Sequence, residues 1–88
     1  MKFHTKFRPG DLVRDKITHD EGIIVTAQAI WCDRDGMMTY RDCTERKPRL
    51  ATYIRGHYGV RQKTFDGSLN GWWYEDNQME LVKKGFLH

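Results

Sequence analysis

A turn that leads directly into a strand, near the amino end of the chain, constrains the fold more than any other feature. Residues 8–14 read Arg-Pro-Gly-Asp-Leu-Val-Arg. Pro9 fixes the backbone angle φ and Gly10 permits angles that other residues avoid, so this pair predicts a turn. Asp11 can then accept hydrogen bonds from nearby backbone groups, and an apolar strand begins directly after it.

The matching feature at the other end of the chain is an aromatic strand, a helical turn and a last strand. Residues 71–75 read Gly-Trp-Trp-Tyr-Glu, and residues 79–82 read Met-Glu-Leu-Val. Between them, residues 76–78 are expected to form a single helical turn. We expect these two ends of the chain to close one small β-barrel.

Short runs of β-branched and aromatic residues, separated by turn residues, occupy most of the chain between these ends. Asp35-Gly36 predicts a hairpin, and Gly56-His57 is expected to turn the chain. A helix over residues 25–31 is the competing interpretation, but no cap supports it. The pattern favours an all-β barrel or sandwich. The expected strands span residues 11–17, 23–31, 37–43, 50–55, 58–63, 72–75 and 79–83.

The size of the chain limits it to one small core. Its 88 residues suffice for one domain. We expect an arm at 1–10, the barrel domain at 11–83 and a tail at 84–88. Charged residues make up 31% of the chain, and no apolar run approaches the roughly 20 residues of a membrane span. The amino terminus lacks the apolar core of a signal peptide, so we expect a cytoplasmic protein with no membrane partner.

Two cysteines, Cys32 and Cys43, are expected to be free thiols in a reducing compartment. A disulfide between them is geometrically possible if Asp35-Gly36 forms a hairpin that pairs their strands. A zinc site would need four ligands and usually shows tight Cys or His spacing, which this chain lacks. We therefore expect no metal and no cofactor.

Four short segments, taken in order, resemble small SH3-like barrels. These are residues 7–14, Gly-Ile-Ile-Val at 22–25, Tyr-Gly-Val-Arg at 58–61, and 73–82 with its helical turn. The group includes KOW and Tudor-like modules and many small bacterial and phage proteins. The resemblance implies a barrel of five to seven short strands. The chain departs from it by an extended hairpin and loop insertion at about 31–57, where individual function is expected because loops on a rigid barrel usually carry it.

A basic segment with interleaved aromatic residues spans 41–63. Cations attract phosphates and flat rings stack on bases, so this composition predicts a nucleic-acid surface. A solvated charged face is the alternative, since the formal net charge of the whole chain is only +3. The candidate residues are Arg41, Arg46, Lys47, Arg49, Tyr53, Arg55, His57, Tyr58, Arg61 and Lys63.

An aromatic cluster comprises Trp31, Tyr40, Trp72, Trp73 and Tyr74. Core packing is the favoured role for most of these rings, and a Tudor-like cage for a methylated cation is the alternative. Strand alternation puts Trp72 and Tyr74 on one face and Trp73 on the other. Outward rings could anchor a protein partner, so Trp31 and Trp73 are candidate protein-interface residues.

Catalytic motifs are missing from the sequence. It contains no Gly-x-Ser-x-Gly, no His-Glu-x-x-His and no phosphate-binding Gly-Lys-Ser/Thr. Cys32 or Cys43 with His57 could be invoked as nucleophile and base, but nothing else supports that pairing. The leading hypothesis is a non-enzymatic module that binds nucleic acid through residues 41–63. The alternative is a protein-interaction module, for example a small phage factor acting on a host complex.

Overall fold

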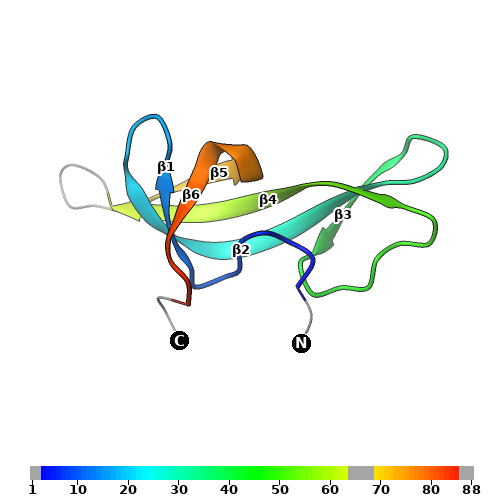
Figure 1. Cartoon of the computed structure of the whole chain (residues 1–88), viewed down its shortest axis with the longest axis horizontal. Coiled ribbons are helices and arrows are strands. Elements are labelled where there is room, and N and C mark those ends of the chain that lie inside the picture. The colour runs from blue at the N-terminus through cyan, green and yellow to red at the C-terminus, as the bar shows by residue number, and fades with distance from the viewer. Residues whose placement is uncertain (1–2, 64–68, 86–88) are drawn as a thin grey trace.

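A computed structural model describes residues 3–63 and 69–85 as a six-stranded antiparallel sheet (Figure 1). One 3-10 turn, η1 (Asp76–Gln78), joins the last two strands, and the described residues contain no α-helix. The expected all-β class and the helical turn at 76–78 are confirmed. The strands are β1 (Leu12–Asp15), β2 (Glu21–Cys32), β3 (Met38–Asp42), β4 (Thr52–Lys63), β5 (Leu69–Glu75) and β6 (Met79–Lys83).

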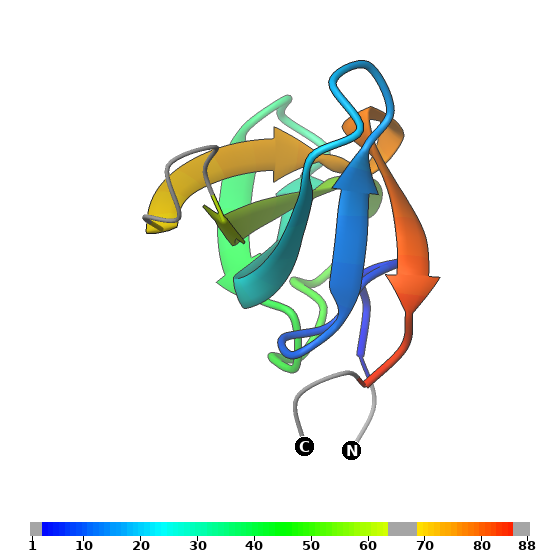
Figure 2. The same ribbon diagram turned by 90° about the vertical axis from the view of Figure 1, so that its left-hand side faces the viewer.

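The two longest strands, β2 and β4, form the middle of the sheet. The order is β5-β4-β2-β1-β6, and β3 pairs with the carboxyl half of β2. Seen along the long axis, the sheet curves, and η1 carries the chain from β5 to β6 (Figure 2). β5 and β6 are the end strands, so in the described residues the hydrogen-bond pairing leaves the sheet open. The molecule measures 46 × 25 × 17 Å.

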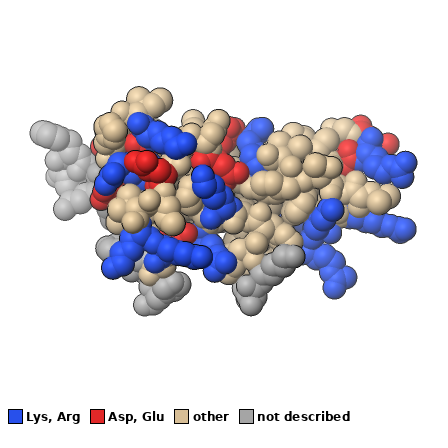
Figure 3. Space-filling model, in the orientation of Figure 1, with Lys and Arg blue, Asp and Glu red and all other residues tan. Residues whose placement is uncertain are grey.

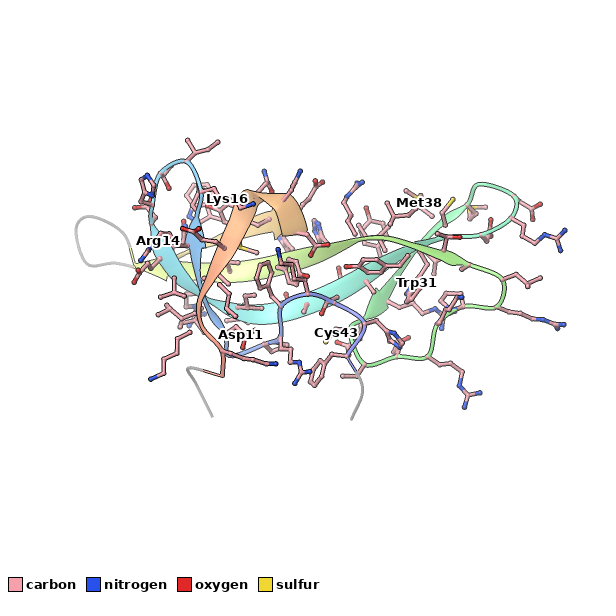
Figure 4. All side chains as sticks on the ribbon, in the orientation of Figure 1. Asp11, Arg14, Lys16, Trp31, Met38 and Cys43 are labelled. Carbon is pink, nitrogen blue, oxygen red and sulfur yellow. The ribbon has the colours of Figure 1, made fainter. Side chains whose placement is uncertain are left out.

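The predicted turn before the first strand is present. The Asp11 amide donates to the Arg8 carbonyl oxygen over 3.1 Å, and Gly10 has a φ of 94°. The carboxylate of Asp11, which is 2% exposed, accepts from the amides of Arg8 (3.0 Å) and Gly85 (2.8 Å). This one side chain therefore ties the start of the sheet to the residues after β6 (labelled in Figure 4).

Two clusters of buried side chains make up the core. The main cluster surrounds Tyr58, against which Phe7 packs edge-on with ring centroids 5.4 Å apart. It also contains Val13, Ile24, Ala27, Cys43, Val60 and Met79. The smaller cluster lies in the extension of β2 and β4 and holds Ala29, Trp31 and Ala51, with Tyr53 packed against it.

The expected turn at Gly56-His57 is wrong, because the chain continues through it as the single strand β4. A side chain at Gly56 would collide with the Tyr58 hydroxyl and the Asp76 carboxylate. The Gly56 amide donates to that carboxylate over 2.8 Å. Glycine is therefore present here for the close approach of Asp76 from η1, and its conformational freedom is not used for a turn.

The insertion at about 31–57 is an extension of the central strands beyond the main core. β2 and β4 remain paired as far as Cys32 and Thr52, and β3 returns along the other edge of β2. The hairpin expected at Asp35-Gly36 joins β2 to β3, with Gly36 at a φ of 83°. Within residues 3–63 and 69–85, no helix is long and apolar enough to cross a membrane.

Candidate functional site

The sheet has a second face, turned away from the main core cluster, which we call the outer face. Side chains alternate along β4, so Tyr58, Val60 and Gln62 are buried on the core side. The alternate positions of β4 point to the outer face. They are Arg55, His57, Gly59 and Arg61. This strand therefore presents two arginine side chains and an imidazole on the outer face, while Gly59 is covered by the Thr26 hydroxyl and the Trp73 ring.

Three aromatic rings from three strands form a row across the outer face. The imidazole of His57 (β4) stacks on the indole of Trp73 (β5), with centroids 4.7 Å apart and planes 13° from parallel. On its other side, His57 meets Tyr40 (β3) edge-on at 5.8 Å. Trp73 is 60% exposed and Tyr40 is 55% exposed. Flat ring surface is thus open to solvent at both ends of the row.

A hollow of about 370 Å³ adjoins Trp73 on this face. Gly59 pairs with Trp73 and Gly71 pairs with Arg61, so two positions without side chains lie on adjacent strands. Val25, the extra residue of a β-bulge in β2, forms another wall. The remaining lining comes from Thr26, Val60 and Trp72.

Charge on the outer face is partly neutralised. Arg55 forms an ion pair with Glu75 over 3.1 Å, whereas Arg61 is exposed and makes no ion pair within the part of the chain that the structure describes. Arg41 follows Tyr40 on β3 and therefore lies on the opposite side of the sheet, where it pairs with Glu45 over 3.6 Å. Arg61 is therefore the cation most available beside the aromatic row.

Three further predicted cations lie at one end of the molecule. Arg46, Lys47 and Arg49 are exposed in the loop between β3 and β4, and none forms an ion pair with another described residue. Blue side chains gather at this end in Figure 3. Lys63 ends β4, and its side chain lies outside the described residues. The basic segment is thus divided among β3, an exposed loop and the outer face of β4.

Two predicted rings are not available to a ligand. Tyr58 is 0% exposed, and its hydroxyl donates to the Asp76 carboxylate while accepting from the Phe7 amide. Burial, together with the Asp76 carboxylate, raises the pKa of the Tyr58 phenol. Trp31, labelled in Figure 4, is 4% exposed, and the rings of His4 and Tyr53 pack edge-on against its indole. Both rings are structural, and neither contributes to a binding surface.

Tyr53 is also held in place, since its hydroxyl donates to Asp76 over 3.0 Å. The same carboxylate thus accepts from Tyr53, Gly56 and Tyr58, which fixes η1 on β4. Asp76 was not a candidate from the sequence. A single acidic residue in a helical turn gives no signal that it will meet side chains some twenty residues earlier.

The cysteines occupy separate positions and do not assemble with His57. The Cys43 amide donates to Ala27, whereas Cys32 pairs with Met38 at the other end of the β2–β3 ladder. Cys43 faces the main core, where burial raises its pKa, and His57 lies on the outer face. Within the described residues, no three His, Cys, Asp or Glu side chains gather as metal ligands would.

Comparison with known proteins returned no matching protein-family model, no matching curated protein and no matching solved structure. The candidate site therefore rests on the geometry of this chain alone. Its components are the aromatic row, the adjoining hollow and the cations at the edges of the face.

Proposed function

We propose that this chain is a non-enzymatic module that binds nucleic acid through the outer face and the adjacent basic loop. The observation that carries the proposal is the row of Tyr40, His57 and Trp73, which exposes ring surface between Arg61 and the basic end of the molecule. We further propose that the sheet is a variant of the SH3-like barrel. The Asp11 turn and the 3-10 turn before the last strand support that assignment.

Aromatic rings and cations would contact different parts of a nucleic acid. Bases stack on exposed aromatic rings irrespective of sequence, since every base has a π face. Phosphates are attracted to Arg and Lys, and their binding releases counterions, which makes affinity fall with salt. Of the residues proposed from the sequence, those on the outer face or in the adjacent loop are Arg46, Lys47, Arg49, Arg55, His57 and Arg61.

A titration of labelled single- and double-stranded oligonucleotides at several salt concentrations tests this proposal. The test variant is Arg46→Glu/Arg49→Glu. The matched control is Lys16→Glu/Lys84→Glu, which makes the same change in net charge at exposed positions outside the candidate surface. If both arginines neutralise phosphates, the slope of log K against log salt should fall by about 1.4–1.8 in the test variant alone.

Absence of binding to any oligonucleotide at low salt would eliminate the proposal. The second candidate is then a protein-interaction module, which the exposure of Trp72 and Trp73 favours. A pull-down from lysate, with and without nuclease, separates the two functions. A partner retained after nuclease treatment and lost on Trp73→Ala is the result expected of a protein interface.

A further inference from the structure

The hollow beside Trp73 is open at Gly71 on β5, whereas the space over Gly59 on β4 is filled by the Thr26 hydroxyl and the Trp73 indole. Gly59 lies opposite Trp73, and Gly71 lies opposite Arg61. A Cβ atom built at Gly71 would have the Val60 carbonyl oxygen as its nearest neighbour, 4.0 Å away. The position is therefore open, and ordinary side chains would fit the backbone while filling the hollow.

The walls of the hollow suit a flat group. Trp73 presents an indole that is more than half exposed, and Val25 presents an apolar side chain raised by the bulge. Thr26, the next residue on β2, places its hydroxyl against Gly59, and this hydroxyl makes no hydrogen bond to another described residue. A planar ring could lie against the indole with its polar edge toward that hydroxyl, which can donate or accept.

The rim of the hollow carries an available cation. Arg61 is exposed on the strand that forms the floor, whereas the next arginine on this face, Arg55, is already paired with Glu75. A guanidinium binds a phosphate through paired N–H donors. The hollow thus offers a surface for a ring and, beside it, a site for a phosphate.

We infer that this hollow is a subsite for one unstacked nucleobase of a single-stranded nucleic acid, with Arg61 on the adjoining phosphate. The inference rests on the proposed function and names the ligand class of the same surface. A volume of about 370 Å³ lies within the range of small-ligand pockets and is far too small for a duplex. A base inside a duplex is covered by its neighbours and must leave the stack to enter a pocket.

The decisive variant is Gly71→Val, since valine suits a strand and would occupy the hollow. Trp73→Ala removes the indole wall, and Leu81→Ala on β6 is the control for loss of an exposed apolar side chain. Binding of a fluorescent ten-nucleotide oligothymidylate and of a ten-base-pair duplex is measured by anisotropy. Far-UV circular dichroism and thermal melting establish that each variant is folded.

We expect the wild type to prefer the single strand. Loss of one stacked base should weaken oligothymidylate binding roughly 5- to 150-fold in Gly71→Val and in Trp73→Ala. Leu81→Ala should bind as the wild type does. Arg61→Gln should weaken binding and reduce its salt dependence. The control is Lys16→Gln, which replaces an exposed cation outside the surface and should leave both the affinity and its salt dependence unchanged.

The outcomes separate this inference from the proposed function. Equal binding of duplex and single strand, or single-strand binding that survives Gly71→Val, would overturn the subsite and leave nucleic-acid binding in place. No binding of either oligonucleotide at low salt would contradict both the subsite and the proposed nucleic-acid binding. A preference for the single strand that both hollow variants abolish supports the subsite.

Discussion

The imidazole of His57 lies nearly parallel to the indole of Trp73, with ring centroids 4.7 Å apart. The two residues come from adjacent strands, where His57 pairs with Glu75 and Trp73 pairs with Gly59. Because Gly59 has no side chain, the indole can lean along β4 toward the imidazole. The contact holds an exposed ring in one orientation, so less rotamer freedom remains to be lost when a ligand stacks on it.

This stacked pair should contribute modestly to stability. His57→Ala should lower the free energy of unfolding by about 0.5–1.5 kcal/mol. His57→Phe should keep most of this stabilisation, because a flat ring still stacks on Trp73. Urea denaturation of both variants, and of each combined with Trp73→Ala, measures the coupling. Additive effects of His57→Ala and Trp73→Ala would show that the two rings do not interact.

Loss of the Asp76 side chain should lower the free energy of unfolding more than is usual for a partly exposed residue. Asp76→Ala removes the acceptor of Tyr53, Gly56 and Tyr58 together, and hydrogen bonds to charged groups are the stronger ones. We expect a loss of about 2–4 kcal/mol in urea denaturation. Asn77→Ala, at the next position on the same turn, is the control and should change stability little. Equal effects of the two substitutions would contradict the role assigned to Asp76.

Alkaline pH should destabilise the fold through its buried phenols. Burial, reinforced by the Asp76 carboxylate, raises the pKa of Tyr53 and of Tyr58 above the ordinary 10.0. A phenol with a raised folded-state pKa stabilises the protein below pH 10 and loses that contribution as the pH rises further, because only the unfolded chain releases the proton. Absorbance at 295 nm should show two tyrosines that ionise only on unfolding. Tyr58→Phe should flatten the decline of stability above pH 10, and an unchanged decline would refute this assignment.

The two thiols should differ in reactivity. Cys32 is partly exposed at the end of β2, whereas Cys43 is 2% exposed and its pKa is raised by burial. A chromogenic disulfide reagent should titrate one thiol rapidly in the native protein and two in denaturant. Cys32→Ser should abolish the rapid phase. Rapid reaction of both thiols in the native protein would show that Cys43 is not held in the core.

The features that local chemistry fixes could be predicted from the sequence. Pro9 and Gly10 dictate a turn, Asp35-Gly36 dictates a hairpin, and the β-branched run before Trp31 belongs to one long strand. Each of these depends on neighbours within a few residues. The prediction that Trp73 faces away from Tyr74 and Trp72 also follows from strand alternation alone.

Features that depend on distant contacts could not be predicted in this way. Gly56 resembles a turn residue unless the contact with Asp76 is known. Tyr58 likewise resembles a stacking ring unless it is known that its hydroxyl donates a hydrogen bond to the same carboxylate. The hollow depends on the register that sets Gly71 opposite Arg61. Register is decided by the pairing of whole strands, and the sequence of either strand alone does not contain it.

The most direct test of nucleic-acid binding by the outer face is an NMR titration of the isotopically labelled protein with oligothymidylate at low salt. We expect the largest amide shifts at His57, Gly59 and Gly71, together with the indole N–H of Trp73. Amides of β1 and β6 should serve as the internal control and move little. Shifts confined to β1 and β6, or no shifts at millimolar oligonucleotide, would contradict the account.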